Sequence, residues 1–127
     1  MISFRVLGNL PRKSNGRQIF RPGGRKLIFA KSNKALAYEK SFILQTGYIQ
    51  KGTFADKQQL KMTAYIYYDS QRPDLSDELL CDLMEKSGII PNDRYIFEKH
   101  IYKIIDRKCP RVEVDIEAIS EGTKPLE

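Results

Sequence analysis

The sequence has few of the residues on which zinc sites, disulfide scaffolds and most nucleophilic hydrolases depend. It holds two cysteines, Cys81 and Cys109, and one histidine, His100, among 127 residues. Neither cysteine has the close Cys or His companions of a zinc site, so we expect two reduced thiols and cytosolic chemistry. The motifs G-x-S-x-G, Walker A and H-E-x-x-H are missing. A lone histidine inside an expected strand is more often structural than catalytic.

Long apolar runs are missing as well. Residues 1–5 do not start the apolar run of a signal peptide. No stretch approaches the roughly 20 apolar residues that a membrane-spanning helix needs. We therefore expect a cytoplasmic protein with no membrane partner. The length predicts one domain, which we place at residues 1–120, followed by a frayed tail at 121–127.

Acidic residues are scarce in the first part of the chain. No acidic residue precedes Glu39, whereas nine Lys and Arg residues do. Residues 1–72 carry 14 basic against 3 acidic side chains, and residues 73–127 carry 8 against 13, within a net charge of +6. Such a basic segment attracts a polyanion, because each neutralised phosphate releases condensed counterions. A solvated, highly soluble face is the alternative, and charge alone does not decide between them.

The hydrophobic pattern predicts an α+β domain. Apolar residues alternate in short stretches, which predicts strands, and recur at spacings of three and four in two others, which predicts helices. The predicted elements are a strand at residues 2–6, a hairpin at 18–21 and 26–30, a helix at 33–50, a strand at 59–69, a helix from 74 or 75 to 87, and strands at 95–105 and 111–119 joined as a hairpin by residues 106–110. We expect the two helices to pack on one face of a mixed sheet.

Both predicted helices have one apolar face. In the first helix this face consists of Ala35, Tyr38, Phe42, Thr46 and Ile49, and Ser32 is a plausible N-cap. In the second helix it consists of Leu75, Leu79, Leu83 and Met84, and Gly88 is expected to end the helix in the left-handed conformation.

Carboxylates gather around the second helix. Asp74, Asp77 and Glu78 open it, and Asp93 follows its end. Carboxylates beside a basic surface suit a hard divalent cation such as Mg²⁺, with Mn²⁺ as an alternative, because that ion joins them to phosphate oxygens. The ordinary interpretation stays open: acids in a first helical turn stabilise the helix dipole, Asp74 is a possible N-cap, and Asn-Asp is common in turns.

Four segments together resemble the RusA-type Holliday-junction resolvases of bacteria and phages. Arg72-Pro73-Asp74-Leu75-Ser76-Asp77 and the later Gly88-Ile89-Ile90-Pro91-Asn92-Asp93 resemble the family's R-x-D-L-D-N … G-hydrophobic-x-x-D-D core. The strand at 111–116 resembles its G-R-hydrophobic-E-hydrophobic ending, and residues 10–17 resemble its P-P-x-x-N-R loop. Lys31-Ser32 with Tyr38 matches the segment that leads into its first helix.

The resemblance implies a RusA-like fold and a bacterial or phage-encoded homodimer. It also implies Mg²⁺-dependent endodeoxyribonuclease activity, in which paired phosphodiester hydrolysis resolves branched DNA during recombination and repair. Asp74 and Asp93 match the first and last catalytic aspartates. Ser76 replaces the second one, and we expect Glu78, or else Asp77, to supply the lost carboxylate. We favour Glu78 because a spacing of four residues would stack it over Asp74 on one helix. No lysine matches the family's basic residue in the second helix. The expected DNA-binding residues are Arg12, Lys13, Asn15, Arg17, Arg21, Arg25, Lys26, Lys31, Lys34 and Arg72.

Two other functions remain open on the residues alone. One is a non-catalytic nucleic-acid-binding protein that retains the RusA-like fold but has lost its metal site through Ser76. The other is an interaction protein whose basic half contacts an acidic protein partner.

Overall fold

The computed structural model describes residues 1–12, 17–21, 25–30 and 33–119, the two middle segments as backbone only. The expected tail at 121–127 and the N-cap Ser32 lie outside the described residues. The elements are β1 (Ile2–Leu7), β2 (Arg17–Arg21), β3 (Arg25–Ala30), α1 (Asn33–Thr46), β4 (Leu60–Tyr68), α2 (Glu78–Lys86), the 3₁₀ helix η1 (Asp93–Tyr95), β5 (Ile96–Ile105) and β6 (Arg111–Ala118). Their order and type confirm the predicted α+β class.

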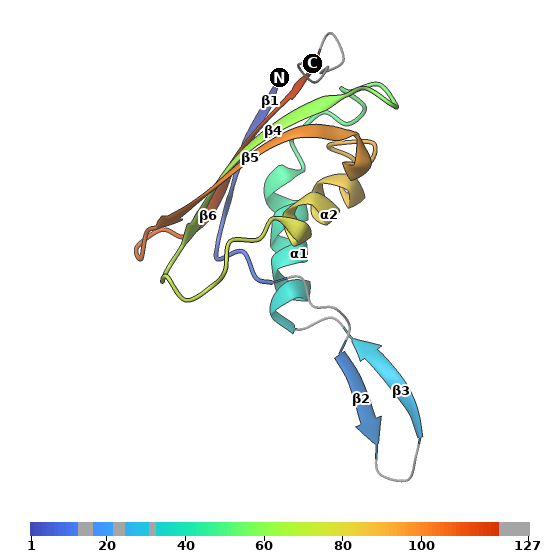
Figure 1. Ribbon diagram of the computed structural model, residues 1–127, viewed down its shortest axis with the longest axis vertical. Coiled ribbons are helices and arrows are strands. Elements are labelled where there is room, and N and C mark those ends of the chain that lie inside the picture. Colours follow the sequence, from blue (N-terminus) through green and yellow to red (C-terminus); the bar gives the residue numbers. More distant parts are fainter. Residues whose placement is uncertain (13–16, 22–24, 31–32, 120–127) are drawn as a thin grey trace, which may run out of the picture.

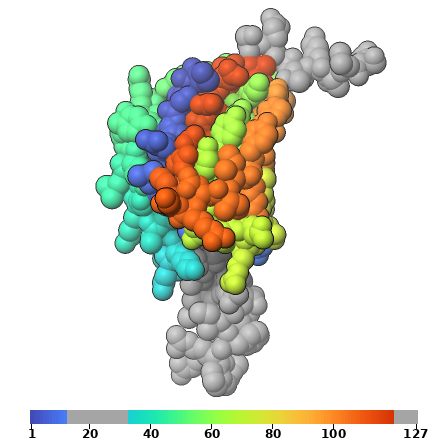
Figure 2. Space-filling view, turned by 90° about the vertical axis from the view of Figure 1, so that its left-hand side faces the viewer, coloured from blue at the N-terminus to red at the C-terminus, as the bar shows by residue number. Residues whose placement is uncertain are grey.

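Four strands form one open, mixed sheet in the order β1-β6-β4-β5. β6 pairs antiparallel with β1 and β4, whereas β5 pairs parallel with β4. Both α-helices lie on one face of this sheet (Figure 1), as the sequence predicts. The other face is open, and its four strands are visible side by side in the space-filling view (Figure 2). β2 and β3 pair antiparallel in a separate two-stranded sheet, which confirms the predicted hairpin.

The predicted hairpin of the last two strands is wrong. β4 lies between β5 and β6, so residues 106–110 pass over the end of β4 instead of making a tight turn. The backbone N–H of Asp106 donates to the carbonyl of Tyr68, the last residue of β4. Five extended residues reach roughly 16 Å, more than the roughly 10 Å between strands that flank a third one, so the connection is long enough.

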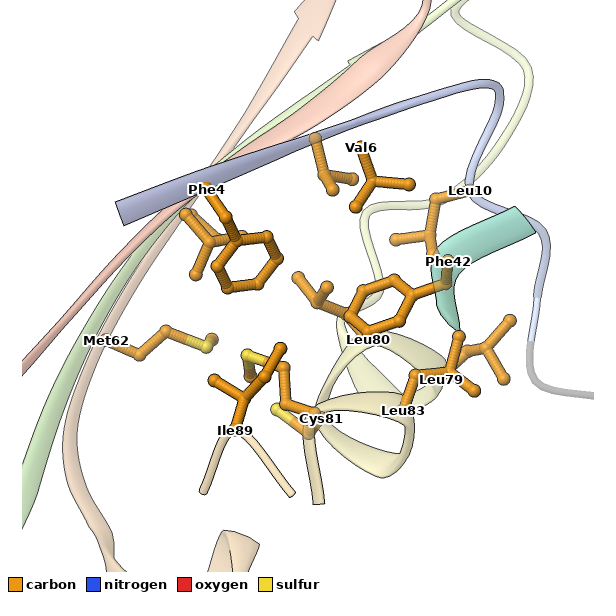
Figure 3. Packing of buried hydrophobic residues seen from close by; sticks show 14 of the residues in the cluster. Phe4, Val6, Leu10, Phe42, Met62, Leu79, Leu80, Cys81, Leu83 and Ile89 are labelled. Atoms are coloured by element: carbon orange, nitrogen blue, oxygen red, sulfur yellow. The ribbon is translucent and has the colours of Figure 1, made fainter. Parts of the chain in front are cut away.

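The core lies between the sheet and the two helices. Along β1, β4 and β6, buried residues alternate with more exposed ones, and the buried residues face the helices. Phe4 meets Phe42 edge to face, with ring centroids 5.9 Å apart. Figure 3 shows these two rings beside Leu80, with Met62 of β4 and Ile89 facing the same space. Burying this many apolar side chains on one face holds the helices against the sheet.

The helix boundaries differ from those predicted at one end of each helix. α1 ends at Thr46 instead of Gln50, and Ile49 stays buried because a turn follows in which its N–H donates to the Thr46 carbonyl. α2 begins at Glu78 instead of residue 74 or 75. The Tyr68 hydroxyl donates to the Asp74 carbonyl and accepts from the Ser76 N–H, both at 3.4 Å. These bonds to Tyr68 replace the backbone bonding of a helical turn that would begin at residue 74.

The predicted helix faces are buried. The five residues of the α1 stripe are all buried, as are Leu79, Leu83 and Met84 of α2. Leu75 lies before α2 and packs partly buried against the core. Gly88 has φ +83°, the left-handed conformation expected of it. Both cysteines are free, with Cys81 buried and Cys109 exposed.

Candidate metal and nucleic-acid site

The segment between β4 and α2 carries the first expected site residues. Lys103 of the edge strand β5 holds this segment in place. Its ammonium donates to the carbonyls of Gln71 and Pro73, at 2.9 and 2.5 Å. The Tyr68 hydroxyl bonds the same segment at Asp74 and Ser76. Four hydrogen bonds therefore position Asp74 and Asp77 although neither lies inside a helix or strand.

Asp74 lies at the exposed edge of this segment. Its carboxylate pairs with the Arg12 guanidinium at 2.5 Å, and the two side chains are 82% and 70% exposed. An ion pair this exposed contributes at most about 1 kcal/mol to stability. The expected stacking of Glu78 over Asp74 is wrong, because it required both residues to lie in one helix, and α2 begins only at Glu78. Glu78 is exposed at that first position.

Asp77 is the shielded carboxylate of the group, with a side chain only 14% exposed. Its Oδ2 accepts a hydrogen bond from the Lys99 ammonium at 2.9 Å and from the Cys81 thiol at 3.4 Å. Asp77 occupies the N-cap position of α2 but makes no capping hydrogen bond. Its carboxylate is oriented toward the sheet instead, where β5 supplies the cation.

Asp93 begins η1, after Asn92. The Asn92 side chain accepts from the Arg94 N–H, and the Asp93 N–H donates to Glu85 of α2, both at 3.0 Å. This ties the turn to the end of α2. The Asn92 oxygen thus serves as an N-cap.

The pKa shifts of two neutral groups relate the carboxylates to one another. Burial raises the pKa of Tyr68, and the charges of Asp77 and Asp74 raise it further. Burial also raises the pKa of Cys81 to about 12, with added contributions from Asp77 and Asp93. Asp77 therefore lies within electrostatic reach of both groups, Asp74 acts on Tyr68 and Asp93 acts on Cys81. We refer to Asp74, Asp77 and Asp93 as the carboxylate row.

Two of the same carboxylates, Asp77 and Asp93, also shift the pKa of Lys99. Burial alone would lower the pKa of Lys99, but the hydrogen bond to Asp77 and the charges of Asp77 and Asp93 outweigh it, so the pKa is raised. Within the part of the chain that the structure describes, no three His, Cys, Asp or Glu side chains are gathered closely enough to hold a metal ion as they stand. Asp74 and Asp77 are instead paired with Arg12 and Lys99.

A groove of about 830 Å³ adjoins Asp74. It lies between the residues after β1, the start of α1 and the segment before α2, and the basic side chains of Arg12, Lys34 and Arg72 line it. Tyr38 is buried against it, and its hydroxyl has no hydrogen-bond partner among the described residues. Burial raises the pKa of Tyr38, so this hydroxyl stays protonated. Cations and carboxylates therefore share one side of the molecule.

The other expected DNA-binding residues belong to the hairpin region. Arg17, Arg21, Arg25 and Lys26 lie on β2 and β3, where only the backbone is described. Lys13, Asn15 and Lys31 lie outside the described residues. With Arg12, eight of the ten expected residues thus belong to the segment between β1 and α1, which Figure 1 shows leading into α1.

The open sheet face carries charged and aromatic side chains of its own. His100 is hydrogen-bonded to Glu98 at 2.7 Å on this face, opposite the side that carries Lys99. Two aromatic contacts also involve the exposed sides of these strands. Tyr65 stacks on Tyr102 with ring centroids 5.1 Å apart, and the Arg111 guanidinium lies 3.7 Å from the centroid of the Tyr67 ring. The shielded carboxylate Asp77 and its partner Lys99 lie on the opposite, helix side of the sheet.

No protein-family model matches the chain, and no curated protein matches it at a significant level. Among the described residues, no helix has both the length and the apolar character needed to cross a membrane. Sequence reasoning missed three residues that organise the site: Lys99, Lys103 and Tyr68. All three lie on predicted strands, but the roles of Lys99 and Lys103 depend on β5 pairing with β4, which the pattern did not show.

Proposed function

We propose that this protein is a divalent-metal-dependent endonuclease of the RusA type, which cleaves branched DNA as a homodimer. The observation that carries the proposal is a groove lined by Arg12, Lys34, Arg72 and the carboxylate Asp74, next to the shielded carboxylate Asp77 at the start of α2. A basic groove attracts the DNA backbone, whereas a row of carboxylates repels it unless cations intervene. This combination favours a site where a metal ion joins the two.

The donor set suits Mg²⁺ in kind. Carboxylate oxygens are hard ligands, and this ion takes one or two of them together with water and phosphate oxygens. Asp77 and Asp93 would hold it, with Asp74 at the groove and Glu78 at the exposed rim as further ligands. When bound, such an ion lowers the pKa of a coordinated water and polarises a phosphoryl oxygen. Because no three of these carboxylates are close enough together to hold an ion on their own, the ion would bind together with DNA phosphate oxygens.

The protein's own side chains then have distinct tasks. Arg12, Lys34 and Arg72 would bind phosphates along the groove, and the basic hairpin would extend that contact. Such contacts orient the backbone but do not distinguish bases, so we expect little sequence preference. A homodimer with two-fold symmetry would present two equivalent sites to a two-fold symmetric junction.

The experiment is cleavage of a synthetic four-way junction by the purified protein in Mg²⁺ or Mn²⁺. We expect paired nicks near the branch point, abolished in Asp77→Asn and Asp93→Asn while junction binding persists. Asp56→Asn is the matched control, because Asp56 is an exposed aspartate of the loop between α1 and β4. Cleavage that survives both site substitutions would refute the assignment of these ligands.

A non-catalytic DNA-binding protein is the second candidate. Ser76 in place of a carboxylate and the pairing of Asp74 with Arg12 and of Asp77 with Lys99 favour it, because each acid already has a protein cation. Tight, salt-sensitive junction binding without cleavage in either metal would support this candidate. Absence of DNA binding would refute both.

A further inference from the structure

The groove beside Asp74 has an apolar wall that contacts to phosphate would leave unused. The side chains that form this wall are Leu7, Leu10, Pro11, Ala37 and Pro73. The groove volume of about 830 Å³ falls in the range of small-molecule sites, roughly 300–1,000 Å³. A DNA duplex keeps its bases stacked inside and would cover this wall with its charged backbone. An apolar ligand surface fits the wall better.

Tyr38 adds one polar group to this wall. It is only 6% exposed, it lines the groove, and its hydroxyl has no hydrogen-bond partner among the described residues. Tyr68 also lines the groove, but its hydroxyl is already bonded to the Asp74 carbonyl and the Ser76 N–H. A buried hydroxyl without a partner is unfavourable, so a ligand atom that bonds it relieves that cost. The groove therefore favours an apolar ligand with a polar atom at its edge.

Two cations of the groove are available to an anion. Lys34 and Arg72 line it, and neither side chain forms an ion pair within the parts of the chain that the structure describes. Arg12 differs, because it is paired with Asp74. A phosphate beside Lys34 and Arg72 would form charge-assisted hydrogen bonds. An apolar, planar group with polar edge atoms that also carries a phosphate is a nucleotide.

We propose that the groove binds one unpaired nucleotide of a DNA strand. The base lies against the apolar wall with an edge atom bonded to the Tyr38 hydroxyl, and the phosphate lies at Lys34 and Arg72. The inference rests on the proposed function and adds to it the feature of DNA that the groove selects. An unpaired nucleotide costs less to unstack than a paired one. Because a hydroxyl both donates and accepts, all four bases can bond it, and we expect little preference among them.

The test compares two DNA duplexes of equal length, one fully paired and one with a single unpaired nucleotide as a bulge. Fluorescence anisotropy measures binding in Ca²⁺, which takes oxygen ligands as Mg²⁺ does. Tyr38→Phe removes only the hydroxyl, and Tyr48→Phe is the matched control, because Tyr48 is 73% exposed and lies outside the groove lining. Leu7→Ser changes the apolar wall at a half-exposed position and serves if Tyr38→Phe folds poorly, with the exposed Leu44→Ser as its control.

We expect wild type and Tyr48→Phe to bind the bulged duplex about tenfold more tightly than the paired one. In Tyr38→Phe this preference should fall to about twofold or less, with affinity for the paired duplex unchanged. Leu7→Ser should lower the preference as well, and Leu44→Ser should keep it. The melting temperature of Tyr38→Phe should not fall, because the free protein loses no hydrogen bond.

Three results overturn the inference but leave the proposed function standing. The first is equal binding of the two duplexes by wild type, or a preference that Tyr38→Phe retains. The second is a fall of more than about 5 °C in the melting temperature of Tyr38→Phe, which would reveal a partner for the hydroxyl in the free protein. The third is tight binding of free deoxyadenosine monophosphate without any preference for the bulge, which would assign the groove to a free nucleotide. Failure to bind both duplexes and a four-way junction overturns the inference and the proposed function together.

Discussion

The ion pair between Asp77 and Lys99 can be measured without any metal. Asp77→Asn leaves Lys99 without its partner, Lys99→Met leaves a shielded carboxylate, and the double variant removes both charges. The pair is intermediate between exposed pairs, worth about 0–1 kcal/mol, and buried ones, whose disruption costs about 3–5 kcal/mol. With side chains 14% and 42% exposed, we expect each single variant to lose about 1–2 kcal/mol, a fall in melting temperature of about 3–8 °C.

A double-mutant cycle in EDTA is the assay. Urea unfolding of wild type, both single variants and the double variant should give a coupling energy of about 1 kcal/mol, smaller in high salt. Asp93→Asn should change stability little, because the Asp93 carboxylate makes no ion pair within the described part of the chain. Additive single effects, or an equal loss from Asp93→Asn, would refute the placement of Lys99 against Asp77.

Three further predictions concern the thiols, the segment before α2 and the core. Burial first, and then Asp77, raises the pKa of Cys81 from 9.0 to about 12, so alkylation followed by mass spectrometry at pH 8 should find Cys109 modified and Cys81 protected. The folded state favours the protonated thiol, so its contribution to stability is complete below about pH 9 and is lost as pH rises toward 12; alkaline unfolding should be less steep in Cys81→Ala. Lys103→Met, which removes two bonds to backbone carbonyls, should cost about 1–2 kcal/mol and speed amide exchange in residues 70–76. Phe42→Ala should cost about 3–5 kcal/mol in urea unfolding, and a loss under 1 kcal/mol would contradict its fully buried position.

The elements of the fold were predictable because their signals are local. Alternation in β1, β4 and β6 and the stripe of α1 each come from the period of one element. The strand order was not predictable, since β5 and β6 are neighbours in sequence and nothing local shows that β4 lies between them. The start of α2 was misplaced for a related reason: the competing hydrogen bonds come from Tyr68, six residues earlier and on a strand.

The candidate site was predictable in its acids but not in its cations. Asp74, Asp77 and Asp93 stand out in the sequence as carboxylates around one helix. Their partners Arg12 and Lys99 are distant along the chain, and only the folded sheet brings them near. The preference for Glu78 over Asp77 rested on helical spacing from Asp74, which lies outside the helix. Because Asp77 is shielded from solvent and Glu78 is exposed, Asp77 is the better candidate for the carboxylate that Ser76 lacks.

The pairing of β1 with β6 has a practical consequence for experiments. Ile2 is opposite Ile116 at one end of these strands, and at the other end Gly8 bonds Pro110 beside the groove. An affinity handle or fluorophore joined ahead of Met1 would therefore lie at the opposite end of β1 from Gly8, which lines the groove; Figure 1 shows the N-terminus at that far end. Labelled protein can be immobilised there with the groove facing free solution, which suits single-molecule tests of the proposed junction binding.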